Sequence, residues 1–261
     1  MSYADRLFKE GSALTRFSHR ARAQKALDLL RSTGREKFDN VVDYGCADGW
    51  FLKALYDENL SQRGMGIDIN EEDLARSRRL FAEIPSFQFI KTTDLSSDHF
   101  GKFDLVVSME TLEHVADAKV ALAHLQQLCA PDAVALFSVP IEIGPSLLMK
   151  LVGRFVTGLF DKTYRHFNDE ETYSLGEIIE AGVFWKTQNL KCSHNLPNVY
   201  YRGHKGFDYR KLRALVLERF DILATEHSPF PIAKQFLNST IYWLCKPKAQ
   251  PRVTGDNPTP T

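Results

Sequence analysis

The chain has 261 residues, of which 44% are hydrophobic and 25% charged, so its composition is that of a globular protein and not of a fibrous or disordered one. Its 33 basic and 33 acidic side chains balance, which disfavours a protein that binds nucleic acid through broad phosphate contacts. The four cysteines form no CxxC pair, so neither a zinc ribbon nor a disulfide scaffold is indicated, and reduced thiols are expected.

The N-terminal stretch lacks the continuous apolar core of a secretory signal, and no window approaches the ~18 apolar residues of a membrane-spanning helix. We therefore expect a cytoplasmic protein, with a first helix over residues 18–32. Short apolar runs then alternate with amphipathic segments, which predicts a parallel sheet covered by helices on both faces. The predicted strands cover residues 40–44, 64–68, 87–91, 103–108 and 133–139, and the predicted helices between them cover residues 49–59, 71–82 and 117–128.

This alternation stops after Val139. Residues 140–206 form an insertion, and residues 207–248 contain a final helix and two strands whose short connection requires them to be antiparallel. We predict a single domain over residues 1–248. Its fold class is α/β, with a doubly wound, mostly parallel seven-stranded sheet and a C-terminal antiparallel hairpin. Residues 249–261 are rich in Pro, Thr and Gly, which predicts a disordered tail.

A glycine turn follows the first predicted strand, in the stretch VVDYGCADGWFL. Gly45 can adopt backbone angles closed to other residues, and Gly49 lets the chain pass close to a ligand. A nicotinamide-dependent oxidoreductase is one alternative, but the third glycine of its GxGxxG fingerprint is missing. Asp48 also places negative charge where a pyrophosphate would lie at the helix N-terminus. The turn therefore favours a ligand with less negative charge.

Acidic residues lie at the ends of the first three predicted strands. Asp43 is in the first strand, and Asp68 ends the second, about 20 residues after Gly49, where a carboxylate grips a ribose diol in such sheets. Asp94, in TTDL, follows the third strand and is placed to accept a hydrogen bond from the amine of adenine. A cationic ligand that contains adenosine would satisfy all three carboxylates.

Four stretches in order, VVDYGCADGWFL, GMGIDIN, TTDL and FDLVVSMETLEHV, resemble the motifs of class I S-adenosylmethionine-dependent methyltransferases. The resemblance covers residues 40–139 and implies a Rossmann-like methyltransferase fold, with residues 18–139 as the cofactor-binding half. It implies that Asp43 lies near the cofactor ammonium, that Asp68 holds the ribose hydroxyls and that Ile69 packs on the adenine. Ala47 departs from the family, which more often has glycine there. The implied S-adenosylmethionine-binding residues are Asp43, Gly45, Cys46, Ala47, Gly49, Asp68, Ile69, Thr93, Asp94, Leu95 and Met109.

Two carboxylates and an imidazole, Glu110, Glu113 and His114, follow the fourth predicted strand. Their spacing resembles that of ubiquinone-biosynthesis O-methyltransferases and of small-RNA 2′-O-methyltransferases, in which the matching residues are linked to a divalent metal. In one interpretation Glu113 and His114 are catalytic without metal, and His114 is a general base. In the other, Glu110, Glu113 and His114 bind Mg²⁺ or Mn²⁺. The RNA-methylating branch adds a distal histidine, which His204 or His166 would supply.

The insertion contains an amphipathic helix, with apolar residues on one face of residues 146–160. This helix is expected to be either a lid on the domain or a surface for peripheral membrane contact. The stretches GHKGFDYRKL and SPFPIAKQFLNST are similar to segments of bacterial methyltransferases of polysaccharide assembly. The expected reaction is O-methylation of a small-molecule, glycan or lipid-like acceptor. The alternatives are a metal-dependent RNA 2′-O-methyltransferase and a non-catalytic S-adenosylmethionine-binding regulatory module, and the oligomeric state stays open.

Overall fold

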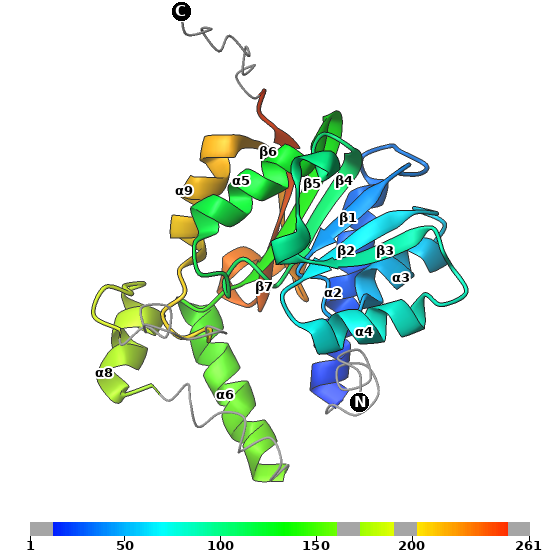
Figure 1. Cartoon of the computed structure of the whole chain (residues 1–261). Helices are drawn as coiled ribbons and strands as arrows, with labels where there is room; N and C mark the ends of the chain where they lie inside the picture. The colour runs from blue at the N-terminus through cyan, green and yellow to red at the C-terminus, as the bar shows by residue number, and fades with distance from the viewer. Residues whose placement is uncertain (1–12, 161–172, 191–202, 250–261) are drawn as a thin grey trace, which may run out of the picture.

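The computed structural model describes residues 13–160, 173–190 and 203–249. Its centre is a seven-stranded sheet in the order β3-β2-β1-β4-β5-β7-β6 (Figure 1). β1 to β5 pair in parallel, whereas β7 runs antiparallel between β5 and β6. The predicted doubly wound sheet with an antiparallel C-terminal pair is thus confirmed. The strands are β1 (Val41–Tyr44), β2 (Gly64–Asp68), β3 (Phe87–Lys91), β4 (Phe103–Met109), β5 (Cys129–Pro140), β6 (Phe220–Ser228) and β7 (Thr240–Pro247).

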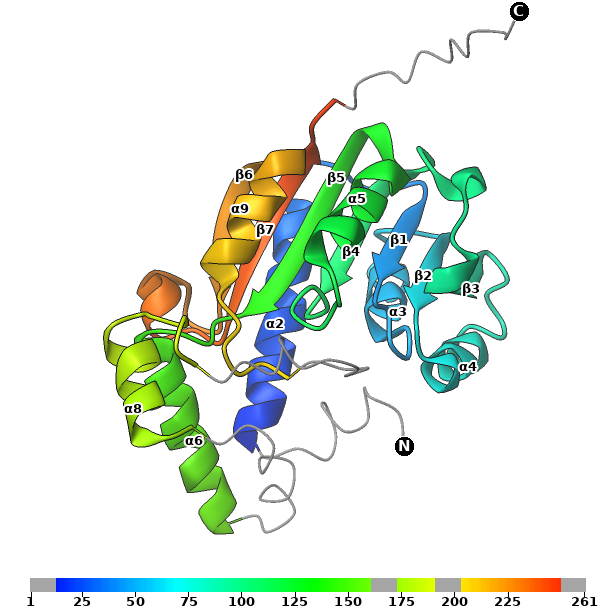
Figure 2. The same cartoon turned by 60° about the vertical axis from the view of Figure 1, so that its left-hand side comes forward.

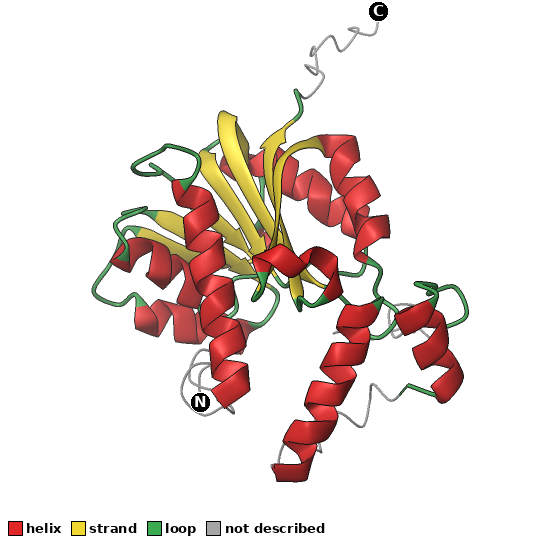
Figure 3. Ribbon diagram, turned by 180° about the vertical axis from the view of Figure 1, so that it is seen from behind, coloured by secondary structure: helices red, strands yellow, loops and turns green. Residues whose placement is uncertain are grey.

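Helices cover both faces of the sheet. Three of them, α2, α3 and α4, pack on the face that Figure 3 shows, where α2 contacts β6 and β7, and α5 and α9 pack on the other. Side chains alternate along a strand, so Val41 joins the apolar cluster under α2 to α4, and Val42 joins the cluster under α5 and α9. These helices are α2 (Ala13–Arg31), α3 (Trp50–Asp57), α4 (Glu71–Leu80), α5 (Ala118–Leu128) and α9 (Tyr209–Arg219).

Polar caps fix where three of the helices begin. Asn70 caps α4, Asp117 caps α5 and Asp208 caps α9, each by accepting a hydrogen bond from the backbone N–H of the second helical residue. Because Asn70 and Asp117 lie in the loops after β2 and β4, they also order the chain at the carboxyl ends of those strands.

The insertion leaves the sheet at the end of β5 and forms α6 (Pro145–Phe160), α8 (Leu175–Ile178) and the π-helical turn η5 (Ile179–Val183). Figures 1 and 2 show α6 and α8 beyond the carboxyl ends of the parallel strands. Gly144 precedes α6 with a φ of 69°, and its N–H donates to the carbonyl of Ala181 at 2.8 Å. The short element η5 is therefore tied to the start of α6.

A small apolar core holds α6 to η5. It contains Leu147, Ala181 and Leu190, all buried, with Leu151 and Tyr173 packed against them. The face of α6 that carries Val152 and Phe155 points away from this core, because these side chains are 63% and 69% exposed. The helix therefore packs on the rest of the insertion with one face only, and a second apolar face stays exposed.

Some elements differ from the sequence prediction. α2 begins five residues earlier than predicted. β5 begins at Cys129, before its predicted start, and contains Pro131. Proline is tolerated there because it lies where the register between β4 and β5 shifts, so its missing N–H removes no hydrogen bond between the strands. The link between β6 and β7 contains a 3-10 segment, η7 (Pro231–Phe236), that the sequence pattern did not reveal. His166 and the predicted tail from residue 250 onward lie outside the described residues. None of the helices in the described ranges is long and apolar enough to span a bilayer.

Candidate functional site

The turn between β1 and α3 contains three residues with positive φ. Gly45, Ala47 and Gly49 have φ values of 84°, 46° and 77°. The N–H of Gly45 donates to the carbonyl of Ile67 at 2.7 Å, which holds the turn against β2. A Cβ atom on Gly45 would lie 2.2 Å from Cγ2 of Thr111, so the loop after β4 packs directly on this glycine. Only glycine satisfies both the backbone angle and the space.

Asp43 is buried in β1, and its Oδ1 has no hydrogen-bond partner among the described residues. Burial, and then the negative charge of Asp68, raise the pKa of Asp43 to about 8. A buried acceptor without a partner is costly. The carboxyl group of Asp43 is therefore suited to a cationic ligand group, which would supply both a hydrogen bond and a compensating charge.

Asp68 ends β2 and lies opposite the turn. Its Oδ2 accepts a hydrogen bond from the N–H of Ala47 at 2.8 Å, and its Oδ1 accepts one from the N–H of Asn70 at 2.8 Å. Partial burial raises the pKa of Asp68, while these backbone hydrogen bonds act in the opposite direction. Each carboxylate oxygen can accept a second hydrogen bond. The carboxylate is thus oriented and retains the capacity to bind a pair of vicinal hydroxyls.

The predicted adenine-side residues lie at the ends of β2 and β3. Ile69 is 52% exposed, and Thr93 and Asp94 are exposed in a 3-10 turn after β3, while Leu95 is half-buried against the core. The parallel register pairs Asp68 with Lys91, so these residues follow neighbouring strand ends. The structure thus places Asp94 at the same edge of the sheet as Asp43 and Asp68, but on its solvent-exposed side.

Cys46 lies in the turn after β1, and Met109 ends the neighbouring strand β4. Cys46 is buried against Gly66, and burial, followed by the charges of Asp43 and Asp68, raises the pKa of its thiol well above the usual value. This thiol is therefore not a nucleophile. Met109, at the end of β4, is half-buried against the cluster under α2 to α4.

The loop after β4 is held in a strained conformation. Glu110 has a φ of 52°, which is uncommon for a residue with a side chain. Its N–H donates to the carbonyl of Ser138 at 2.9 Å, and its Oε2 pairs with Nη1 of Arg22 at 2.6 Å. The hydroxyl of Ser138 also donates to Oε1 of Glu110 at 3.2 Å. Arg22 and Ser138 were not among the predicted site residues, because the sequence gives no sign that α2 reaches β4.

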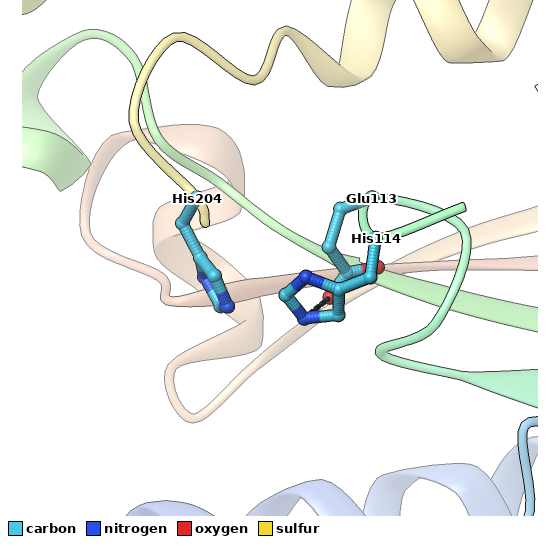
Figure 4. Close-up of side chains that lie close together, drawn as sticks. All are labelled: Glu113, His114 and His204. Atoms are coloured by element: carbon cyan, nitrogen blue, oxygen red, sulfur yellow. Dashed lines mark ion pairs between the residues drawn. The ribbon is translucent and has the colours of Figure 1, made fainter. Parts of the chain in front are cut away.

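The same loop carries Glu113 and His114, and the chain before α9 brings His204 beside them (Figure 4). Atoms of these three residues that can bind a metal lie within 4.8 Å of one another. Nε2 of His114 is 3.7 Å from Oε1 of Glu113, and the two imidazole centroids are 4.8 Å apart. Burial, and then the charge of Glu110, raise the pKa of Glu113 well above its usual value.

The group of candidate metal ligands therefore differs from the predicted set of Glu110, Glu113 and His114. Glu113 and His114 lie together as predicted, but His204 joins them and the carboxylate of Glu110 is directed to Arg22 and Ser138. Of the two distal histidines considered, His204 is the one that the described part of the chain brings to the site. The sequence indicated His204 only through the resemblance to the RNA-methylating branch.

A cavity of about 320 Å³ lies next to this cluster, between the loop after β4 and the start of α9. Its lining includes Leu112, Glu113, Leu190, Phe207 and Lys211. The lining combines apolar side chains with polar ones such as Glu113 and Asp208, and Nζ of Lys211 donates to the hydroxyl of Thr187 at 3.2 Å. The site thus has two carboxylates, Asp43 and Asp68, from β1 and β2, and two imidazoles, His114 and His204, beside the loop after β4. The cavity adjoins this loop next to α9.

Comparisons with known proteins show which family the chain belongs to. Residues 16–172 match the protein family described as "Methyltransferase domain". The ubiquinone biosynthesis O-methyltransferase of Psychrobacter cryohalolentis is 33% identical over 132 residues, which are 47% of this chain and 49% of that relative. The chain thus spans about half the length of the curated relatives it matches.

Solved structures share the fold at low sequence identity. The PH0226 protein of Pyrococcus horikoshii OT3 superposes with a TM-score of 0.60 and 15% identity, over 95% of this chain and 100% of that one. The N-methyltransferase NodS of Bradyrhizobium japonicum WM9, solved with S-adenosyl-L-homocysteine, gives a TM-score of 0.54 and 14% identity over 88% of this chain and 87% of that one. By family match and fold, the chain belongs to the class I S-adenosylmethionine-dependent methyltransferases. This confirms the family that the sequence motifs resembled.

Proposed function

We propose that the chain transfers the methyl group of S-adenosylmethionine to a hydroxyl group of a small-molecule, glycan or lipid-like acceptor. The proposal depends on one observation: a pair of acidic residues and a pair of imidazoles lie at the same edge of the sheet. Asp43 and Asp68 form an acidic side suited to a cation and a diol, and His114 and His204 form a side suited to proton transfer. The similarity to an O-methyltransferase supports the hydroxyl as the accepting group.

The residues fit the cofactor at two positions. The buried Oδ1 of Asp43, which has no partner among the described residues, would accept a hydrogen bond from the cofactor ammonium. Asp68, held by two backbone N–H groups, would accept hydrogen bonds from the ribose hydroxyls. When bound, S-adenosylmethionine supplies a methyl group already activated by its sulfonium. The chain's own task is to hold the acceptor oxygen in line with that group, which contributes about 7–11 kcal/mol in well-oriented cases.

The proton of the acceptor hydroxyl must leave as the new carbon–oxygen bond forms and the carbon–sulfur bond breaks. His114 is the proposed general base, because a neutral imidazole accepts a proton near neutral pH. Glu113 is buried and its pKa is raised, so it is better suited to donate a hydrogen bond that orients the acceptor. Glu113 and His114 thus remain the proposed catalytic residues.

The cofactor assignment is tested by Asp68→Ala. Loss of the carboxylate removes the acceptors for the ribose diol, and hydrogen bonds to charged groups contribute about 1.5–3 kcal/mol each. We expect calorimetry to show S-adenosylmethionine binding at least about tenfold more weakly. Asp57→Ala, which removes an exposed carboxylate that pairs with Lys53 on α3, is the matched control and should bind as the wild type does. Equal affinity of the Asp68 variant and the control would contradict the ribose assignment.

Methyl transfer itself is tested with isotopically labelled S-adenosylmethionine and a fractionated metabolite extract. Labelled product that is resistant to mild base and contains a new methyl ether would support O-methylation. Label on nitrogen or carbon would still identify the chain as a methyltransferase, but it would contradict the proposal that a hydroxyl group accepts the methyl group. Absence of product in every fraction would favour the non-catalytic S-adenosylmethionine-binding module.

A metal-dependent variant of this function, including RNA 2′-O-methylation, is the second candidate. It is supported by the grouping of Glu113, His114 and His204, a carboxylate and two imidazoles of the kind that Mg²⁺ or Mn²⁺ can bind. We expect this candidate to show loss of transfer on treatment with a chelator, recovery on addition of Mn²⁺, and the same loss in His204→Ala. Full transfer by metal-free protein would remove this candidate and leave the imidazole-base mechanism. The balanced net charge of the chain disfavours RNA as the acceptor.

A further inference from the structure

A buried ion pair, Glu142 and Lys150, contacts His204. Glu142 follows β5 and is 1% exposed. Its Oε1 accepts a hydrogen bond from Nζ of Lys150, on α6, at 2.6 Å, and the same oxygen is 3.3 Å from Nδ1 of His204. One carboxylate oxygen thus joins a residue of the lid helix to an imidazole of the site.

The contact defines which nitrogen of His204 carries the proton. A carboxylate paired with an ammonium is an acceptor only, so the hydrogen bond requires the proton on Nδ1 of His204. In the neutral ring Nε2 is then the basic nitrogen. Figure 4 shows the His204 ring beside that of His114, and their centroids are 4.8 Å apart. The carboxylate thus fixes both the tautomer and the position of the ring.

The stability of the fold alone does not explain why the ion pair of Glu142 and Lys150 is buried. Removing two charges from water costs several kcal/mol per ion, and apolar side chains of similar volume often give equal or greater stability. The side chains of Glu142 and Lys150 are 1% and 16% exposed, so the pair bears much of this cost.

We propose that Glu142 and Lys150 are positioning residues that hold His204 against His114, so that α6, which carries Lys150, helps to order the acceptor side of the site. The proposal rests on the proposed methyl transfer and adds to it a role for the lid helix. Glu142 acts on His204 through the hydrogen bond from Nδ1, and Lys150 acts through Glu142, while the charge of Lys150 also opposes the rise in the pKa of Glu113. Neither residue is assigned a contact with the acceptor or the cofactor.

The test replaces the pair with apolar residues of similar size, in the double variant Glu142→Leu/Lys150→Met. Thermal unfolding should occur at the same temperature as in the wild type or higher, because no buried charge is left without its partner. The affinity for S-adenosylmethionine should stay within twofold. With the acceptor fraction identified by labelled S-adenosylmethionine, kcat should fall on the order of tenfold or more, as for other residues that orient a functional imidazole. Lys150→Arg, which keeps a cation beside Glu142, should retain most of the activity.

A direct readout is the tautomer of His204, from the ¹⁵N shifts of labelled histidine in the full chain at pH 8.5. The His204 signals are assigned by their loss in His204→Gln. The wild type should show the proton on Nδ1, and the double variant should lose this preference. Lys53→Met, which removes a cation from an exposed pair on α3, should leave both the tautomer and kcat unchanged.

Two results would overturn the proposal. One is a wild-type His204 with its proton on Nε2, and the other is a double variant with unchanged kcat and unchanged tautomer, which would make the pair a structural contact only. Failure of the proposed function is distinguishable, because it would appear as absent methyl transfer in the wild type. The tautomer measurement does not depend on that result.

Discussion

Asp43 combines a cost in stability with its proposed role in cofactor binding. Its pKa in the folded protein is about 8, against an ordinary value of 3.8, because burial and then the charge of Asp68 disfavour the ionised form. The folded protein therefore keeps a proton that the unfolded chain has released. The contribution to stability is fully present below about pH 4 and is lost as the pH rises towards 8, by about 1.4 kcal/mol per pH unit.

Asp43→Asn should therefore stabilise the protein without cofactor, since an amide of the same shape does not titrate. We expect its melting temperature to exceed that of the wild type by an amount that grows between pH 4 and pH 8 and is constant above. Its affinity for S-adenosylmethionine should fall, because the ammonium loses its carboxylate. Thermal scans and calorimetry at pH 5, 7 and 9 check both effects. A lower melting temperature at pH 8 would show that Asp43 is ionised and paired in the folded protein.

At the scale of elements, Gly144 lies in the connection between β5 and α6. A Cβ atom there would lie 2.4 Å from Cζ2 of Trp185, and the residue has a φ of 69°. Trp185 in turn packs edge-on against Phe236 of η7, at 6.0 Å between ring centroids, and its carbonyl accepts a hydrogen bond from Arg210 at 2.7 Å. The close approach of Trp185 to the backbone thus joins the start of α6 to η7 and α9.

Gly144→Ala should displace Trp185 and destabilise the fold by about 2–4 kcal/mol, from the backbone angle together with overpacking. Gly34→Ala is the matched control, because Gly34 has a similar φ of 76° but no atom within 4 Å of the added Cβ. The control should show the cost of the backbone angle alone. Denaturant unfolding followed by tryptophan fluorescence measures both variants. Equal losses would show that the ring moves away without cost.

The sequence predicted the elements of the sheet better than the site between them. The bounds of β2 and β3 agree with the prediction, because alternation and apolar runs are local properties of the chain. The acidic residues at the strand ends were found for the same reason, since a parallel sheet brings these ends to one edge. The partners of Glu110 and His204 depend instead on how α2 and the insertion pack. Arg22 is 88 residues from Glu110, and Glu142 is 62 from His204, so no local pattern could indicate these contacts.

For the whole molecule, the exposed face of α6 bears on how a lipid-like acceptor would arrive. α6 lies beyond the carboxyl ends of the parallel strands (Figure 2). The loop after β4, which carries His114, lies at the same edge of the sheet, and His204 is grouped with His114. Val152 and Phe155 are 63% and 69% exposed, on the face of α6 that does not pack against the small apolar core of the insertion. A bilayer on this face would present a lipid acceptor at the edge where the imidazoles lie, so the acceptor would not have to cross water.

We therefore expect the protein to float with liposomes of phosphatidylcholine and phosphatidylglycerol. Val152→Ser/Phe155→Ser should weaken this association at least about tenfold, because burial of a large apolar side chain contributes about 1.5–3 kcal/mol. Leu223→Ser removes a side chain of similar exposure, 60%, from the edge strand β6 and should float as the wild type does. If the wild type does not associate with liposomes, α6 is a lid only, and a water-soluble acceptor becomes the better hypothesis. If both variants associate as the wild type does, the membrane contact lies on another face, and the geometric argument for delivery at the edge of His114 fails.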